Sequence, residues 1–281
     1  MKISLIITVY NIEKYIAQCL DSCINQTHRD IEVIVVDDCG TDKSMDIVRS
    51  YTDERIKIVT HTENMGAGWA RRHGIEAATG DYVITVDGDD WLSEDFIEKL
   101  VKGAEETGAD IVSGGLTAVH VDGKIEPKTF KPHVSEGMQK LADYGQKKII
   151  FLANKIVRRE MYDTIPYSTR RYCEDTPVII PLLHLANKVA YVDTGGYYYR
   201  QHAESLCHRV NDFEQALFKA LCSIDCNRYL NDKEVELQGL ISKGEFVAWC
   251  SMVRRLITDE LAEKYKSEID ELMHGISTYC K

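Results

Sequence analysis

The chain has 281 residues, with 45 Asp or Glu against 34 Lys or Arg, so its formal net charge is −11. The 44% share of hydrophobic residues is too high for a disordered chain, and 18 Gly with only 5 Pro exclude collagen-like sequence. The acidic balance argues against nucleic acid as a partner, because carboxylates repel the phosphate backbone. No apolar run approaches the roughly 18–20 residues of a membrane-spanning helix, and residues 1–4 lead into a strand-like run rather than a signal peptide.

The nine cysteines do not form a C-x-x-C pair of the kind that binds zinc or carries redox chemistry. Cys19 and Cys23 lie on an apolar helical stripe, which indicates packing in the core. Because no signal peptide is evident, we expect a reducing compartment, the cytoplasm.

The first 115 residues alternate strand-like and helix-like patterns. Apolar strand-like runs cover 3–9, 32–36, 56–60, 82–86 and 110–113, and helical patterns cover 13–25, 45–51, 66–79 and 93–104. Strands that are apolar at nearly every position and are separated by helices predict an α/β fold with a mostly parallel sheet covered on both faces. In such sheets, ligands bind beyond the carboxyl ends of the strands.

The pattern changes after Gly115. Asp122-Gly123, between two strand-like runs, predicts a hairpin. Residues 174–186 predict a helix, 189–199 a return to strand, and everything from 211 onward helices. We therefore expect one domain over 1–208, made of halves 1–115 and 116–208, followed by a C-terminal helical extension over 209–281.

Polar side chains gather where the predicted strands end. Thr8 and Tyr10 close the first strand, Asp37-Asp38 follow the second, and Asp87-Gly88-Asp89-Asp90 follow the strand over 82–86. A single Asp in such a place is ordinarily a turn or cap residue. Three Asp in four positions repel one another at a low-dielectric edge, and a divalent cation removes that repulsion. All-oxygen ligands suit Mg²⁺ or Mn²⁺ completed by phosphate oxygens, so we predict Asp87, Asp89 and Asp90 as metal ligands.

The predicted phosphate ligand is not held by a nucleotide loop of the ATP or NAD type. The sequence has no G-x-x-x-x-G-K-[ST], and Gly66-Ala67-Gly68 lacks a third glycine. Tyr10, with Thr8 beside it, is suited to contact a nucleobase. Asp37 or Asp38 is suited to accept a hydrogen bond from a uracil-type imide or a ribose hydroxyl. Arg71 and Arg72, on the helix after Asn64–Gly66, either reach the nucleotide or are solvated helix charges.

An ordered set of segments resembles family 2 inverting glycosyltransferases with the GT-A fold. These segments are Ile6–Asn11, Asn25–Thr27, Glu32–Asp38, Asn64–Gly66, Ala70-Arg71 and Gly80–Tyr82, and Asp87–Asp90 falls where the family has its D-x-D motif. The resemblance is close over 1–115 and looser to about 208. It implies a smaller mixed sheet on the acceptor side, a nucleoside-diphosphate sugar donor, above all a UDP-sugar, and Mn²⁺ or Mg²⁺ between the Asp motif and the diphosphate. Gly88 would contact the donor. The sequence departs from the family at Cys39, where Gly or Asn is common, and at Arg72-His73, where Asn is common.

Inverting transfer also requires a general base for the acceptor hydroxyl. Glu174-Asp175 resembles the family's acidic pair near the acceptor pocket, which implies Asp175 as the base and Glu174 as a residue that orients it. Alone, the pair reads as a helix N-terminus. Arg200 and His202 resemble the family's late loop over the donor phosphates, and Lys155 resembles a segment near the diphosphate or acceptor; a satisfied loop histidine is the alternative for His202.

Three other classes of protein are alternatives to a glycosyltransferase. A sugar-phosphate nucleotidyltransferase would carry a basic Gly-rich loop where this chain has Tyr10–Glu13. A receiver domain leaves the second half unexplained, and a carbohydrate-binding module needs no metal–diphosphate site. The expected acceptor is a saccharide or a lipid-linked saccharide in cell-surface polysaccharide synthesis. The helical tail has three alternatives: a homodimer interface, packing on the core, or contact with the inner face of the cell membrane.

Overall fold

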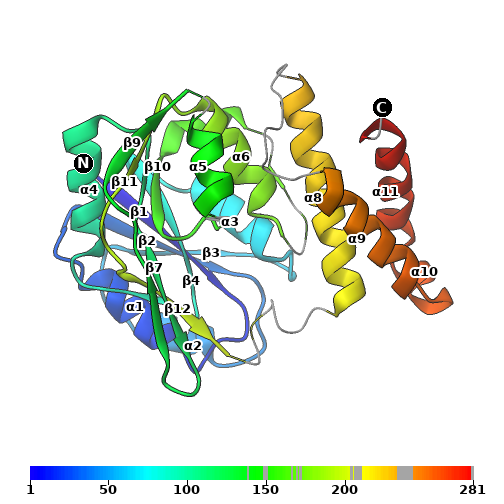
Figure 1. Ribbon diagram of the computed structural model, residues 1–281. Coiled ribbons are helices and arrows are strands. Elements are labelled where there is room, and N and C mark those ends of the chain that lie inside the picture. The colour runs from blue at the N-terminus through cyan, green and yellow to red at the C-terminus, as the bar shows by residue number, and fades with distance from the viewer. Residues whose placement is uncertain are drawn as a thin grey trace.

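The apolar runs of the first half form parallel strands that are buried along nearly their whole length, as the sequence predicts. The computed structural model describes residues 1–137, 139–147, 151–165, 167–168, 170, 173–202, 205, 211–232 and 243–279. Within these residues a large sheet has the order β3-β2-β1-β4-β10-β6-β11-β9 (Figure 1). The bounds are β1 Ile3–Val9, β2 Ile31–Asp37, β3 Ile56–Thr60, β4 Tyr82–Asp87, β6 Ile111–Ser113, β9 His133–Glu136, β10 Lys155–Arg158 and β11 Lys188–Tyr191.

The direction of the strands changes beside β4. The strands β3, β2, β1 and β4 pair in parallel, whereas β10 runs antiparallel to both β4 and β6. The register places Thr8 beside Asp87 and Val9 beside Asp37. The carboxyl ends of β1, β2 and β4 therefore meet at one edge of the sheet, and β10 begins at that same edge.

A smaller mixed sheet has the order β5-β12-β7-β8 and consists of β5 Trp91–Leu92, β12 Tyr197–Gln201, β7 Leu116–His120 and β8 Ile125–Lys128. The predicted hairpin turn at Asp122-Gly123 joins β7 to β8, and Gly123 has a φ of 84° that favours glycine. The strand structure predicted over 189–199 is divided between β11 and β12, which lie in different sheets. Gly196 lies at the break, where an added Cβ would come within 2.2 Å of Ser93 Oγ.

Helices cover both faces of the large sheet, and each face has its own apolar cluster. The helices α1 and α4 lie on one face with Ile3, Leu5 and Ile7, whereas α3 and α6 lie on the other with Ile6. Cys19 and Cys23 are buried in the first cluster, as predicted. The bounds are α1 Ile16–Ile24, α2 Ser44–Arg49, α3 Ala67–Glu76, α4 Phe96–Thr107, α5 Gln139–Lys147, the 3₁₀ helix η1 Arg159–Thr164, and α6 Thr176–Leu185.

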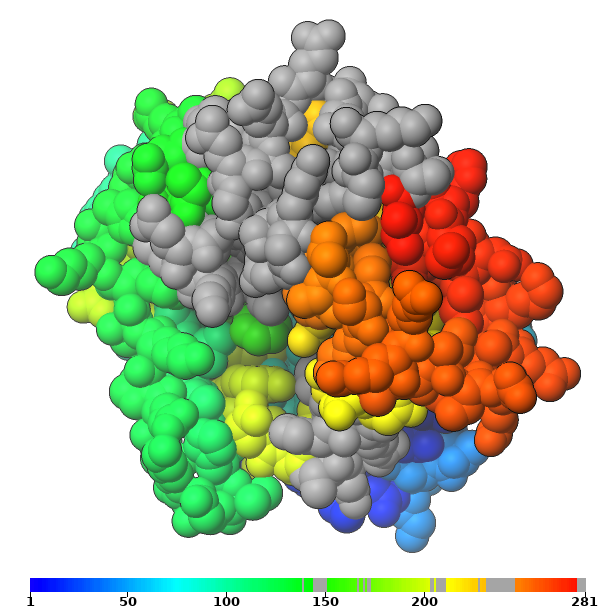
Figure 2. Space-filling model, turned by 45° about the vertical axis from the view of Figure 1, so that its right-hand side comes forward, coloured from blue at the N-terminus to red at the C-terminus, as the bar shows by residue number. Residues whose placement is uncertain are grey.

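The predicted helical tail consists of α8 Asp212–Asp232, α9 Lys243–Leu256, α10 Asp259–Lys264 and α11 Lys266–Tyr279. These helices share a third apolar cluster, and α8 lies against α6 (Figure 1). In Figure 2 the C-terminal helices (orange to red) lie on one side of the visible face, and the green chain that follows α4 lies on the other. Over the part of the chain that the structure describes, no helix combines the length and apolar character needed to cross a bilayer. The boundary predicted near residue 208 lies outside the described residues, so the division into domains stays a prediction.

Candidate active site

One buried guanidinium joins the two acidic motifs that the sequence singles out. Arg71 on α3 donates from Nη2 to Asp87 Oδ1 at 2.8 Å, at the carboxyl end of β4. From Nη1 it donates to Asp175 Oδ1 at 2.9 Å and also to Glu174 Oε1, just before α6. Although burial opposes it, the three carboxylates raise the pKa of Arg71 well above its ordinary value. Arg71 therefore remains charged and holds Asp87, Glu174 and Asp175 around one point.

The position of Arg71 depends on how the chain enters α3. Asp38 is buried, and its carboxylate accepts hydrogen bonds from Met65 N at 2.8 Å and Gly66 N at 2.9 Å. His61 Nδ1 lies 2.7 Å from the same carboxylate. Asp38 thus fixes the loop that precedes α3. Asp37 is buried beside it, and its Oδ1 accepts from Cys39 N at 3.2 Å.

The three Asp of the predicted metal motif have different surroundings. Asp87 faces Arg71, whereas Asp89 Oδ2 lies 2.8 Å from His202 Nε2. Asp90 is 1% exposed, and its two oxygens accept hydrogen bonds from Tyr197 Oη and the Arg200 backbone N, both at 2.8 Å. Asp90 therefore ties the motif to β12.

The backbone between Asp87 and Asp89 needs glycine because it lies close to its neighbours. An added Cβ at Gly88 would come within 2.3 Å of Ile12 Cδ1 and 2.7 Å of the Thr8 carbonyl oxygen. Thr8 is half-buried on β1, and Tyr10 just beyond it is 46% exposed. The predicted donor side chains at the ends of β1, β2 and β4 are therefore brought to one edge, with Tyr10 as its exposed member.

Burial gives the acidic side chains of this cluster raised pKa values. It raises the pKa of Glu174 to about 7 and also raises that of Asp175, in both cases against the opposing charge of Arg71. Burial and the charge of Asp87 raise the pKa of Asp89, while His202 opposes the shift. A carboxylate whose pKa is raised toward neutrality is a better proton acceptor, so the cluster suits general-base chemistry.

A second group holds Asp175 from the side of β10. Asp175 Oδ2 accepts from Leu152 N at 3.2 Å, in the loop that leads into β10. Lys155 is 3% exposed, and its ammonium donates to Ala153 O at 2.9 Å, to Asn154 Oδ1 at 2.8 Å and to Phe151 O. Burial lowers the pKa of Lys155 to about 7, with Asp175 opposing the shift. Lys155 therefore shapes the loop beneath Asp175, and its three donors face protein oxygens.

Arg200 contacts the Asp motif through its side chain as well as through its backbone N–H. Its guanidinium lies over the rings of Tyr15, at 4.8 Å from the centroid, and Trp91, at 4.5 Å. Its Nε donates to Asp89 O at 2.8 Å, and its Nη2 donates to Gln18 Oε1 at 2.6 Å. The sequence reasoning missed Tyr15 and Trp91, and the only signal available was that both are aromatic residues beside predicted site segments.

The described residues do not contain a group of three or more His, Cys, Asp or Glu side chains arranged to hold a metal ion. The chemistry of the motif still suits a hard cation, because Asp89 lies beside Asp87 and their charges repel at a buried edge. Mg²⁺ is commonly bound by only one or two carboxylates, with phosphate and water completing its shell. The residues therefore fit a cation that arrives together with a phosphate.

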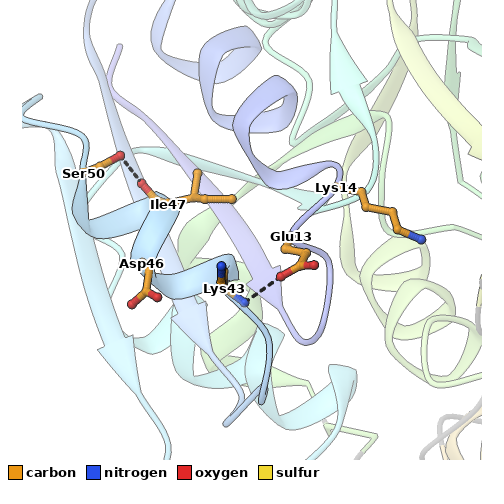
Figure 3. A pocket seen from close by; sticks show the side chains of 6 residues that line it. All are labelled: Glu13, Lys14, Lys43, Asp46, Ile47 and Ser50. Atoms are coloured by element: carbon orange, nitrogen blue, oxygen red, sulfur yellow. Dashed lines mark hydrogen bonds between the residues drawn. The ribbon is translucent and has the colours of Figure 1, made fainter.

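An open depression on the surface lies between α2 and the loop before α1 (Figure 3). It is lined by Glu13, Lys14, Lys43, Asp46, Ile47 and Ser50. Lys43 N donates to Glu13 Oε2 at 2.9 Å and links its two walls. The predicted donor, metal and base residues are not among the residues that line it, so we place the chemistry at the strand edge.

The model of the family described as Glycosyl transferase family 2 matches residues 4–165. The chain belongs to glycosyl transferase family 2. The family resemblance stated from the sequence is therefore confirmed.

Individual relatives agree with the family match. The putative glycosyltransferase EpsH of Bacillus subtilis is 34% identical over 233 residues, which cover 78% of this transferase and 65% of EpsH. The putative teichuronic acid biosynthesis glycosyltransferase TuaG of the same organism is 37% identical over 183 residues, 64% of this chain and 71% of TuaG. The transferase thus spans slightly less than two thirds of the length of EpsH.

Among solved structures, S. aureus TarS in complex with UDP matches this transferase with a TM-score of 0.72 and 22% identity. The match covers 98% of this chain and 81% of that one. It confirms the predicted GT-A fold, with a large mostly parallel sheet, a smaller second sheet and flanking helices.

Proposed function

We propose that this transferase moves a sugar from a UDP-sugar to a hydroxyl of a saccharide or lipid-linked saccharide, with inversion, in the synthesis of a cell-surface polysaccharide. The observation that carries the proposal is the Arg71 guanidinium, which holds the Asp motif and the Glu174-Asp175 pair within hydrogen-bonding reach of one group. Donor phosphate and acceptor hydroxyl would then meet beside the same cluster. The UDP complex of TarS and the teichuronic acid role in the name of TuaG support the donor and the pathway class.

In this proposal Asp175 is the general base. Its carboxylate takes the proton of the acceptor hydroxyl as that oxygen attacks the anomeric carbon, and the bond from that carbon to the UDP oxygen breaks on the opposite side. Burial favours proton uptake by Asp175, whereas Arg71 and the Leu152 N–H keep the carboxylate oriented and ionised beforehand. Glu174 shares the guanidinium and orients the base through it.

The same proposal places the donor at the edge formed by β1, β2 and β4. Tyr10 and Thr8 lie at the nucleoside end of this edge, with Asp37 beside them. Asp89, with Asp87 next to it, would hold Mn²⁺ or Mg²⁺, and His202 lies within reach of the same carboxylate. When bound, the cation offsets the negative charge that gathers on the departing diphosphate. Asp90, predicted as a third ligand, anchors the motif to β12 in this arrangement.

Calorimetry of UDP binding with and without Mn²⁺ tests the donor site. We expect Mn²⁺ to strengthen UDP binding by wild type and not by Asp89→Ala. The matched control is Asp95→Ala, whose carboxylate pairs with Lys99 on α4. Equal dependence on Mn²⁺ in wild type and Asp89→Ala would rule out the metal role of Asp89.

A screen of nucleotide sugars for Mn²⁺-dependent transfer or hydrolysis tests the activity itself. We expect turnover with a UDP-sugar, and Asp175→Asn should retain UDP binding while losing roughly 10²–10⁴-fold in transfer. Retained turnover in Asp175→Asn would show that Asp175 is not the general base. The acceptor, a membrane contact, a homodimer and the cytoplasmic location stay predictions.

A further inference from the structure

Arg170, which lies just before the acidic pair, binds two of the C-terminal helices. Arg170 Nε and Nη2 donate to the two carboxylate oxygens of Asp225 on α8, at 2.5 and 2.9 Å. Arg170 Nη2 and Nη1 also donate to Glu271 on α11, at 2.8 and 3.3 Å. Two-point contacts between guanidinium and carboxylate fix orientation as well as distance. Arg170 therefore fastens this part of the chain to two helices of the tail.

A second contact with α8 lies closer to the acidic pair. The carbonyl oxygen of Cys173 accepts a hydrogen bond from Cys222 Sγ at 3.0 Å, and Cys173 packs against the apolar cluster of the tail. Cys173 has a φ of 55°, which is costly for a residue with a side chain. A strained backbone persists only when surrounding contacts stabilise it. For Cys173, next to Glu174, α8 provides such a contact through Cys222.

The opposite side of the same segment is closed by α3. An added Cβ at Gly68 would come within 2.9 Å of Ser168 O, 3.4 Å of Arg170 O and 3.5 Å of Glu174 Cβ. The described residues from Ser168 to Glu174 therefore lie between α3, which carries Arg71, and α8. Because α3 packs closely against the other side, we expect a change in the position of α8 to affect Glu174.

The tail also holds the chain that follows the acidic pair. Asp175 O accepts from Val178 N at 3.1 Å and Ile179 N at 2.8 Å in the first turn of α6. Farther along, α6 packs against α8, where His184 Nδ1 lies 3.1 Å from Tyr229 Oη. Asp175 is thus flanked by two segments that both contact α8.

We propose that Arg170 is a positioning residue through which α8 and α11 hold Asp175 in its productive place. The inference rests on the proposed role of Asp175 as the base. The C-terminal helices are then a working part of the active site, because misplacing a reacting group by about 1 Å can cost 10²-fold in rate.

The test compares turnover with donor affinity in Arg170→Gln, Arg170→Lys and Asp225→Asn. In Arg170→Gln we expect kcat to fall by roughly 10–10²-fold with the KM of the donor unchanged within about twofold. Arg170→Lys should recover part of the loss, and Asp225→Asn should lower kcat although its side chain lies on α8. The matched control is Arg55→Gln, because Arg55 also binds a carboxylate at two points, on Asp53, and lies far from the base in the fold. A kcat in Arg170→Gln equal to that of Arg55→Gln would overturn the proposal.

Hydrogen exchange provides a readout that does not depend on activity. The amides of Val178 and Ile179, which bond to Asp175 O, should exchange faster in Arg170→Gln than in wild type or Arg55→Gln. Unchanged exchange at these amides would refute the positioning role of Arg170 even if the protein turns over a nucleotide sugar. Faster exchange in Arg170→Gln, together with no turnover of any nucleotide sugar by wild type, would support the positioning role of Arg170 and reject the proposed function.

Discussion

Replacing Arg71 by Met removes the one charge that the Asp motif and the Glu174-Asp175 pair share. Arg71 is 7% exposed, and its nitrogens lie 2.8 Å from Asp87 and 2.9 Å from Asp175. Unit charges about 4 Å apart interact by about 4 kcal/mol at an effective dielectric constant near 20. Because about 1.4 kcal/mol corresponds to a factor of ten, we expect kcat at pH 7 to fall roughly 10²–10³-fold.

The pH dependence has a definite sign in this variant. Arg71 opposes the effect of burial on Asp175, so its loss raises the pKa of Asp175 further. A base must be ionised to act, so the acid limb of the kcat profile should move to higher pH. Arg71→Lys should restore part of the activity, since an ammonium keeps the charge but lacks the planar fork that spans several carboxylates.

The assay is turnover of the UDP-sugar against pH, with UDP affinity measured beside it. Arg72→Met is the control, because Arg72 is the next residue on α3 and pairs with Glu76 outside the cluster. If Arg71→Met keeps the turnover and acid limb of Arg72→Met, the electrostatic reasoning is wrong. If UDP affinity falls while the acid limb stays in place, the role in nucleotide binding predicted from the sequence is the right one.

Three further predictions concern buried polar and small residues. Glu32→Gln should lose about 2–3 kcal/mol of unfolding free energy at pH 7. Although burial opposes it, hydrogen bonds from Lys57 and others hold the pKa of Glu32 well below its ordinary value. The gap to wild type should therefore shrink as pH falls below about 4.5, and a constant gap in denaturant titrations would contradict this. Gly88→Ala should cost about 1–3 kcal/mol by overpacking against Ile12, and no loss in urea unfolding would show that the strand edge yields. Asp38→Asn should cost about 1.5–3 kcal/mol and speed hydrogen exchange in the loop before α3; unchanged exchange there would refute its role in that loop.

The strand edge could be predicted from sequence because it depends on local pattern. Apolar runs set the parallel strands, and parallel strands bring Thr8, Asp37 and Asp87 to one edge whatever the loops do. The helix and strand bounds of the first half agree with the predictions to within three residues at each end.

The different surroundings of Asp87, Asp89 and Asp90 could not be read from the sequence. All three look alike in a run of four residues, and what separates them are partners far along the chain. Tyr197, more than 100 residues downstream, turns Asp90 into an anchor. The same distance hides the break between β11 and β12, because a run of apolar and aromatic residues does not show that its halves join different sheets.

The burial of Arg71 against carboxylates could be predicted more directly from the sequence. On α3 it shares the buried face with Gly68, Ala70, Gly74 and Ile75. An arginine on a helix face of small residues is placed for burial, and a buried arginine requires carboxylate partners. Two of those partners, Glu174 and Asp175, are 103 and 104 residues away, so their identity still depended on the fold.

The antiparallel placement of β10 has a consequence for how acceptor preference can change. Parallel strands bring only their carboxyl ends to the edge of the sheet that carries the site, so under the proposed function the chain that follows them faces the donor. Because β10 runs the other way, it brings its first residues to this edge, and Leu152 N, in the loop before β10, donates to Asp175 Oδ2. The chain from β7 to α5 lies upstream of this point and takes no part in the pairing between β1 and β4. Under the proposed function, insertions or substitutions in that stretch can therefore change the acceptor side while the donor edge keeps its register.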